Sequence, residues 1–134
     1  MTPDARADAW TALAAAALPT GALVALLKVF GSPESLLGAS RARIAAIAGA
    51  EVAGRLAAPD PERSRATRAW LDDPSHRLLA WDDEAYPPQL LEIGDPPPVL
   101  FAIGRVDLLA RPSIAIVGSR QATPQGRDDA RAFG

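Results

Sequence analysis

Proline divides this chain into two parts of different character. Ten of the 13 prolines lie from Pro59 onward, whereas the residues before it form long runs rich in alanine and leucine. Proline interrupts helices and lacks the backbone N–H that a sheet needs, so the second part is restricted to short elements joined by rigid connectors. We therefore expect a helical part followed by short strands, with the change at the segment Ala57–Pro61.

The first part predicts short helices separated by turns that contain glycine. Apolar residues recur at helical spacing from Asp4 to Leu18 and again from Leu23 to Phe30. The expected N-caps are Ser32, Ser40 and Asp60, and the expected helix ends are Gly31, Gly38 and Gly49. These signals predict a compact all-α module of about four or five helices, joined by a further helix to the second part.

The segment from Ile44 to Ala53 has the outline of a helix-hairpin-helix, in which a glycine turn presents backbone N–H groups that can hold a DNA phosphate. Ala50 and Glu51 stand where a second glycine and a basic partner would be expected, and an acidic side chain repels phosphate. Two interpretations remain open, a phosphate-binding hairpin and a hairpin that only packs. We favour packing, because short amphipathic helix pairs are common core units.

Short apolar runs in the second part predict strands at residues 78–81, 99–103 and 114–117. The last run, Ile114–Val117, is apolar on both alternating faces, as a buried strand of a parallel sheet requires. It leads into a polar turn and a predicted helix from about Pro124. A strand, a turn and a helix start make the first half of a βαβ unit, whose turn lies where ligands bind.

The turn carries groups suited to an anion. Arg120 supplies a planar charged fork that matches phosphate oxygens, Gly118 allows a close approach, and Ser119 and Thr123 offer hydroxyl donors. Thr123 also fits a helix N-cap, with Pro124 in the first turn. The spacing of the turn is neither GxGxxG nor GxxxxGK[ST], so the turn is not one of the usual nucleotide-binding motifs. Its donors predict a phosphate-bearing polymer or nucleotide, held by the backbone and one arginine. The alternative is that Arg120 is a solvated loop residue and the glycines only make the turn.

Charge and residue counts exclude other classes of site. The net charge is -2, so the chain is not a polybasic protein that binds nucleic acid by bulk charge. With no cysteine and one histidine, thiolate and histidine-rich metal sites are excluded. The acidic run Asp82–Glu84 lacks the spacing of a calcium site and predicts a solvated turn. We expect neither a metal nor a cofactor.

Other conspicuous residues favour structural roles. The three tryptophans, Trp10, Trp70 and Trp81, are expected as core anchors rather than as platforms for DNA bases. His76 is expected as a linker or surface residue. The two proline runs, Tyr86–Pro88 and Pro96–Pro98, are expected as rigid connectors that place the strands.

The apolar stretch between Trp10 and Phe30 is split by Pro19–Gly21 and contains Lys28, so two helices explain it better than a membrane span. The N-terminus lacks the basic region of a signal peptide. We therefore expect a cytoplasmic protein without a membrane contact.

Three blocks of the second part, in their order and spacing over residues 86–126, resemble the DNA-processing protein A family (DprA, also called Smf). The blocks are Tyr86–Leu91, then Asp95–Phe101 with Gly104, then Ile114–Arg120 with Thr123 and Gly126. The resemblance implies a SAM-like, helix-hairpin-helix domain at residues 1–57, a helical linker at 58–75, and the N-terminal part of a Rossmann-like α/β domain at 76–134. The expected fold class is thus all-α followed by the start of α/β.

The resemblance also implies a function. Relatives bind single-stranded DNA, protect incoming strands and load the RecA recombinase during natural transformation, the DNA uptake of competent cells, without covalent chemistry. It implies a homodimer for the full-length protein. Carried over to this chain, it places Gly118, Ser119 and Arg120 against DNA phosphate, with Thr123 and Gly126 supporting the turn.

This chain departs from the family pattern in two respects. It has Gln125 where relatives usually carry an aromatic residue, which leaves a stacking role there without support. It also stops at Gly134, which we expect to lie inside the first helix of the Rossmann-like domain, before the regions for dimerisation and recombinase contact.

Two other functions remain open: a Rossmann-like nucleotide phosphoribohydrolase of the lysine-decarboxylase-like group, whose later Gly-Gly loop and acidic residue this chain lacks, and a helical interaction module followed by a non-functional remnant.

Overall fold

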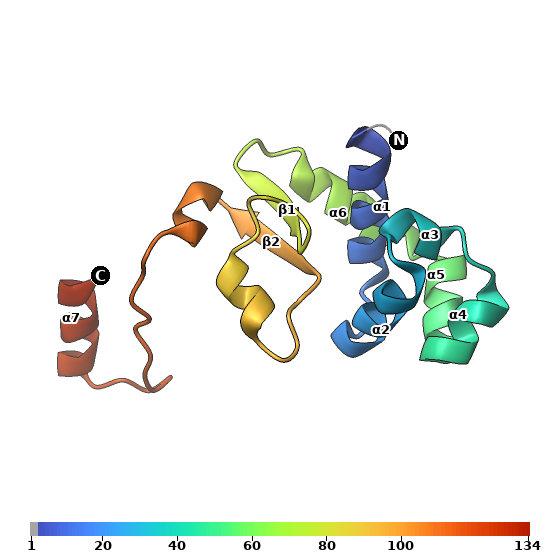
Figure 1. The fold of residues 1–134 in the computed structure, drawn as a ribbon. Coiled ribbons are helices and arrows are strands. Elements are labelled where there is room, and N and C mark those ends of the chain that lie inside the picture. The colour runs from blue at the N-terminus through green and yellow to red at the C-terminus, as the bar shows by residue number, and fades with distance from the viewer. Residues whose placement is uncertain (1–2) are drawn as a thin grey trace.

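The structure is a computed structural model that describes residues 3–134 (Figure 1). Helices occupy the N-terminal part: α1 (Pro3–Ala16), α2 (Thr20–Phe30), α3 (Pro33–Leu37), α4 (Arg41–Ala48), α5 (Ala50–Ala57) and α6 (Pro61–Leu71). Short elements follow: β1 (His76–Ala80), the 3-10 helix η1 (Pro88–Glu92), β2 (Val99–Ile103), the 3-10 helix η2 (Val106–Ala110) and α7 (Pro124–Phe133). The predicted order, an all-α part followed by a mixed part, is confirmed.

The local signals that start and end the helices are confirmed. Each predicted N-cap accepts a hydrogen bond from a backbone N–H of the first turn: Ser32 from Ser35 at 3.1 Å, Ser40 from Arg43 at 3.4 Å, and Asp60 from Glu62 at 3.0 Å. Gly31 ends α2 with a φ of 78°, a left-handed conformation that favours glycine. Gly49, with a φ of 90°, turns the chain between α4 and α5.

The core lies between the helices and reaches the sheet. Helix α1 packs on α3 and α6, and α2 packs on α3 and α4. The buried cluster consists of Trp10, Leu13, Leu23, Leu26, Leu27, Leu36, Ile44, Val52, Ala53 and Ala80. Trp10 is only 3% exposed, which confirms its role as a core anchor. Because Ala80 belongs to β1, the helical part and the first strand share one apolar core.

The two strands form an antiparallel pair. His76 lies opposite Ile103, and Ala80 lies opposite Val99. The predicted strand at 99–103 is confirmed, and the one predicted at 78–81 begins two residues earlier and ends at Ala80. Helix α6 leads into this pair and contacts β1, so it joins the helices to the sheet.

The end of α6 is held against the sheet by aromatic stacking. The Trp70 and His76 rings stack with their centroids 4.1 Å apart, and Phe101 meets Trp70 edge-on at 5.2 Å. The Nδ1 atom of His76 lies 2.7 Å from the Trp70 carbonyl oxygen, within hydrogen-bond distance. The expectation that His76 is a linker or surface residue is therefore wrong: it is half-buried and starts β1. Trp70 packs within this stack, but it is half-buried and lies outside the core cluster, so the core anchor predicted there is not found.

Tyr86 joins the two proline runs. Its ring is 3% exposed, and its hydroxyl donates a 2.7 Å hydrogen bond to the carbonyl oxygen of Pro97. Pro98, next to that carbonyl, is buried at the start of β2. The prediction that the proline runs are connectors is confirmed, since this bond places the chain before β2 against the chain after β1. Burial also raises the pKa of Tyr86 above its ordinary value of 10.0.

The raised pKa predicts an alkaline titration that one residue reports. Tyr86 is the chain's single tyrosine, so absorbance near 295 nm follows its ionisation alone. A proton held more tightly in the folded state stabilises the fold below the unfolded pKa of about 10, and this contribution is lost as pH rises through the folded pKa. We expect an ionisation midpoint above the one measured in concentrated urea. Equal midpoints in the two solvents would contradict the burial of the Tyr86 hydroxyl.

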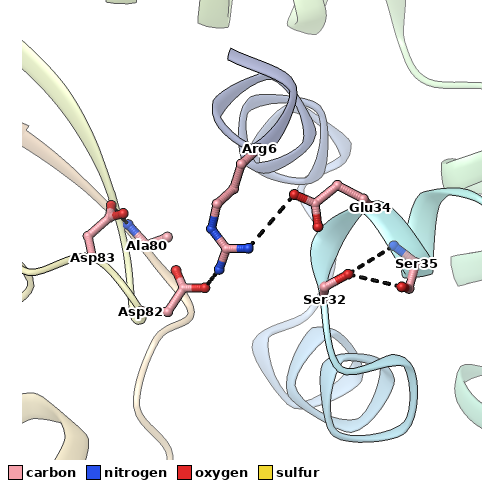
Figure 2. Close-up of polar contacts among 7 residues, drawn as sticks. All are labelled: Arg6, Ser32, Glu34, Ser35, Ala80, Asp82 and Asp83. Carbon is pink, nitrogen blue, oxygen red and sulfur yellow. Dashed lines mark hydrogen bonds and ion pairs between the residues drawn. The ribbon is translucent and has the colours of Figure 1, made fainter. Parts of the chain in front are cut away.

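Arg6 of α1 ties two distant segments together (Figure 2). Its guanidinium forms an ion pair with Asp82, which follows β1, and its other terminal nitrogen lies 3.8 Å from a carboxylate oxygen of Glu34 on α3. Asp83 beside it accepts a 2.6 Å hydrogen bond from the backbone N–H of Ala80. The acidic run is thus a turn held by internal contacts, rather than a merely solvated one.

The geometry around Arg6 predicts that this side chain contributes to stability. Both Glu34 carboxylate oxygens are buried and accept no hydrogen bond among the residues that the structure describes, so Arg6 is the cation that compensates them. Arg6→Gln is expected to lower the free energy of unfolding by about 1–3 kcal/mol. Urea unfolding followed by circular dichroism measures this. The matched control is Arg105→Gln, which breaks an exposed pair with Asp107 and should leave stability unchanged. Equal effects would contradict the account.

Candidate nucleic-acid interface

The segment before the turn differs from its prediction. Ile114–Val117 forms no strand, and Ile114 and Val117 are 92% and 89% exposed. Figure 1 shows this stretch as coil between η2 and α7, away from the helical part. The physical reason is that a segment apolar on both faces becomes a strand only between neighbours, and within residues 3–134 no strand lies beside it. The predicted strand is therefore absent.

The polar turn itself is organised by hydroxyl groups. The chain turns at Arg120 and Gln121, where the backbone N–H of Gln121 donates a 3.1 Å hydrogen bond to the Ser119 hydroxyl oxygen. Such a side-chain turn fixes the backbone around Arg120 without any helix or strand. Ser119 is thus committed as an acceptor within the turn, and its hydroxyl proton stays available for a ligand.

The start of α7 is built as predicted. The Thr123 hydroxyl oxygen accepts a 3.1 Å hydrogen bond from the backbone N–H of Gly126, and Pro124 occupies the first helical turn. A Cβ atom at Gly126 would lie 3.3 Å from the Thr123 hydroxyl oxygen, so glycine leaves room for this cap. The supporting geometry expected of Thr123 and Gly126 is present, whereas a contact of either residue with DNA stays a prediction.

Gly118 does not owe its identity to backbone strain. Its φ lies outside the left-handed region, and an added Cβ atom would meet no heavy atom within 4 Å. Neither the turn nor the packing of the described residues requires glycine here. The open space at Gly118 would admit a ligand to the main chain, and that contact stays a prediction.

Two arginines of this region are free of internal ion pairs. Arg120 in the turn and Arg127 on α7 are exposed, and neither forms a salt bridge with any residue that the structure describes. Arg131, one turn further along α7, lies 3.8 Å from Asp128. Sequence reasoning identified Arg120 and missed Arg127, because the only signal for Arg127 was its place four residues after the predicted cap.

Gln125 is engaged along the helix. Its side-chain amide donates a 2.8 Å hydrogen bond to a carboxylate oxygen of Asp129, four residues later. This is an ordinary surface pair of a helix. It gives no support to a stacking role for this position.

The helical hairpin of α4 and α5 serves packing. Ile44, Val52 and Ala53 are buried in the core, and Glu51 in the first turn of α5 pairs with Arg55 at 2.7 Å. A carboxylate at that helix start opposes an anion. The geometry agrees with the packing interpretation that the sequence favours.

A hollow of about 710 Å³ lies between α1 and β1. Its charged lining mixes Arg6 and Arg77 with Asp73, Asp83 and Glu84, so opposite charges offset one another. It does not have the single-sign lining that concentrates an anion or a cation. The turn after residue 117 remains the better candidate for phosphate.

The described part of the chain shows neither a metal site nor a membrane-spanning helix. Over residues 3–134, no three His, Asp or Glu side chains gather in a way that would hold a metal ion. None of the helices described there is long and apolar enough to cross a membrane.

Comparison with known proteins points to one family. The sequence pattern of the family described as DNA recombination-mediator protein A matches residues 77–134. The chain is similar to Protein Smf of Escherichia coli (strain K12), with 42% identity over 64 residues, which is 48% of this chain and 17% of that protein. No solved structure matches the chain significantly.

A second relative has a similar extent. DNA processing protein DprA of Streptococcus pneumoniae (strain ATCC BAA-255 / R6) is 47% identical over 53 residues, which is 40% of this chain and 18% of that protein. The match thus spans less than a fifth of either relative. Within this chain, the matched region holds β1 apart from His76, all of β2, the polar turn and α7. The C-terminal part of this chain, residues 77–134, is therefore similar to the DNA recombination-mediator protein A (DprA/Smf) family.

Proposed function

We propose that this chain binds single-stranded DNA, with the turn from Gly118 to Arg120 in contact with the sugar-phosphate backbone. The observation that carries the proposal is an exposed Arg120 without an internal ion pair, in a turn ordered by Ser119 and followed by a helix capped by Thr123. All of these residues lie in the part that matches the recombination-mediator family. The expected ligand group is a phosphate diester.

The chemistry of the turn favours binding without sequence readout. A guanidinium and hydroxyl or backbone donors recognise phosphate oxygens, which are the same at every nucleotide. No aromatic residue stands in the turn between Gly118 and Gly126, so base stacking adds nothing there. Binding should therefore depend on ionic strength more than on base sequence.

The wider role that we propose follows from the family. We propose that the whole protein mediates recombination by protecting incoming single strands and loading a RecA-type recombinase during natural transformation, that it acts as a homodimer in the cytoplasm, and that it catalyses no covalent step. We also propose the division into a SAM-like helical module at 1–57, a linker at 58–75 and the start of a Rossmann-like domain at 76–134. The similarity of residues 77–134 to that family supports these proposals.

A titration tests the binding proposal. Fluorescence anisotropy of a labelled oligothymidine is measured with increasing protein at several salt concentrations. We expect log Kd to rise with log salt, with a slope of about 0.7 for each phosphate contacted. An unlabelled oligothymidine competitor should displace the probe, and an oligocytidine of the same length should do so equally well. Absence of binding at low salt, or binding that salt leaves unchanged, would overturn the proposal.

A further inference from the structure

The polar turn and α7 share one hollow. Its volume is about 860 Å³, and the coil residues 114–117 also line it. From the turn, Gly118 and Ser119 line it, and from the helix, Gly126, Arg127 and the carboxylate-bearing Asp129 line it. Arg120 does not line this hollow. Among the described residues that do, Arg127 is the arginine.

The charges around Arg127 leave it available. The two carboxylates of α7 have other partners, since Asp128 lies 3.8 Å from Arg131 and Asp129 accepts a hydrogen bond from Gln125. Arg127 uses its backbone N–H to continue the helix, with a 3.0 Å hydrogen bond to the carbonyl oxygen of Thr123. Its guanidinium forms no salt bridge within residues 3–134. A charged group without an internal partner, beside the turn, can engage an anion at no cost to the fold.

We infer that Arg127 is a second phosphate-contacting residue of this interface. The inference rests on the proposed function, because it needs a DNA strand at the turn. Arg120 and Arg127 then hold the backbone from two sides, Arg120 from the turn and Arg127 from the first half of α7. Two separate cations give the interface two phosphate contacts, and each contributes its own release of counterions.

The test compares single substitutions of equal charge change. Arg127→Gln is measured beside Arg131→Gln, which removes the same charge from the same helix at an ion-paired position. Binding of oligothymidine is followed by anisotropy over a range of salt. We expect Arg127→Gln to weaken binding about three- to tenfold at low salt and to lower the salt slope by about 0.7, whereas Arg131→Gln changes neither substantially.

The outcomes separate this inference from the function on which it rests. If the parent chain binds and Arg120→Gln weakens it, but Arg127→Gln behaves like Arg131→Gln, the inference is overturned and the proposed function stands. If both helix variants weaken binding equally, the effect is one of net charge and the inference is overturned. If the parent chain binds no DNA, both are overturned. Circular dichroism of each variant shows whether the helices are retained.

Discussion

Leu26→Ala is expected to lower the free energy of unfolding by about 2–5 kcal/mol, a large part of the 5–15 kcal/mol that ordinary domains possess. Leu26 has no exposed surface and lies in the core cluster, on a helix that packs against α3 and α4. Truncation removes apolar contacts and leaves a cavity that these short helices cannot easily close. Urea unfolding followed by circular dichroism at 222 nm measures the loss.

The matched control for Leu26 is Leu37 at the end of α3. Leu37 has the same side chain as Leu26, but it is 40% exposed. Leu37→Ala should cost less than about 1 kcal/mol, because much of its surface is already in water. Similar losses for the two variants would show that the core does not lie between α1, α2, α3 and α4.

Arg120→Gln is expected to weaken binding of single-stranded DNA about 10- to 100-fold at low salt. A charge-assisted hydrogen bond to phosphate contributes roughly 1.5–3 kcal/mol, and each 1.4 kcal/mol is a factor of about ten in Kd. The arginine has no internal partner in the described structure, so its loss should leave the fold intact. Anisotropy with labelled oligothymidine gives the affinities, and circular dichroism gives the helix content.

The control for Arg120 is an exposed arginine on a helix far from the turn in sequence. Arg65→Gln on α6 removes one charge at an exposed position, where the arginine pairs with Glu62 at 3.0 Å. We expect it to change DNA affinity little, since α6 lies outside the turn. If the Arg120 variant binds DNA as tightly as the Arg65 variant, the turn is not part of the DNA interface.

The helix boundaries were predictable because their causes are local. A cap such as Ser32 and a terminator such as Gly31 act within one turn of the residues they serve, and both are visible in the sequence. The cap at Thr123 belongs to the same class. The helical part and the start of α7 follow from such signals.

The failed predictions concern partners that are distant in sequence. Ile114–Val117 has the composition of a buried strand, but a strand exists only where neighbours pair with it, and composition does not supply them. His76 was misjudged because its stacking on Trp70 and its place opposite Ile103 are set by tertiary structure. The tie of Arg6 to Glu34 and Asp82 is nonlocal in the same way (Figure 2).

The candidate site was predictable in part for the same reason. The sequence places Gly118, Ser119 and Arg120 in one turn because they are adjacent. It does not show that Arg127 lines a hollow with Ser119, because that requires the direction in which α7 leaves the turn. The division of the chain at residues 57 and 76 stays a prediction, and the shared core residue Ala80 joins the two parts physically.

The most direct test of the account is a ¹H–¹⁵N NMR titration of the chain with oligothymidine, which reports every backbone amide and the Nε–H groups of the arginines. We expect the largest shifts at the amides from Gly118 to Gly126 and at the Arg120 side chain, with small changes in α2 to α5. Binding that shifts only amides of the helical part, and leaves those of the turn in place, would contradict the claim that phosphate is held there.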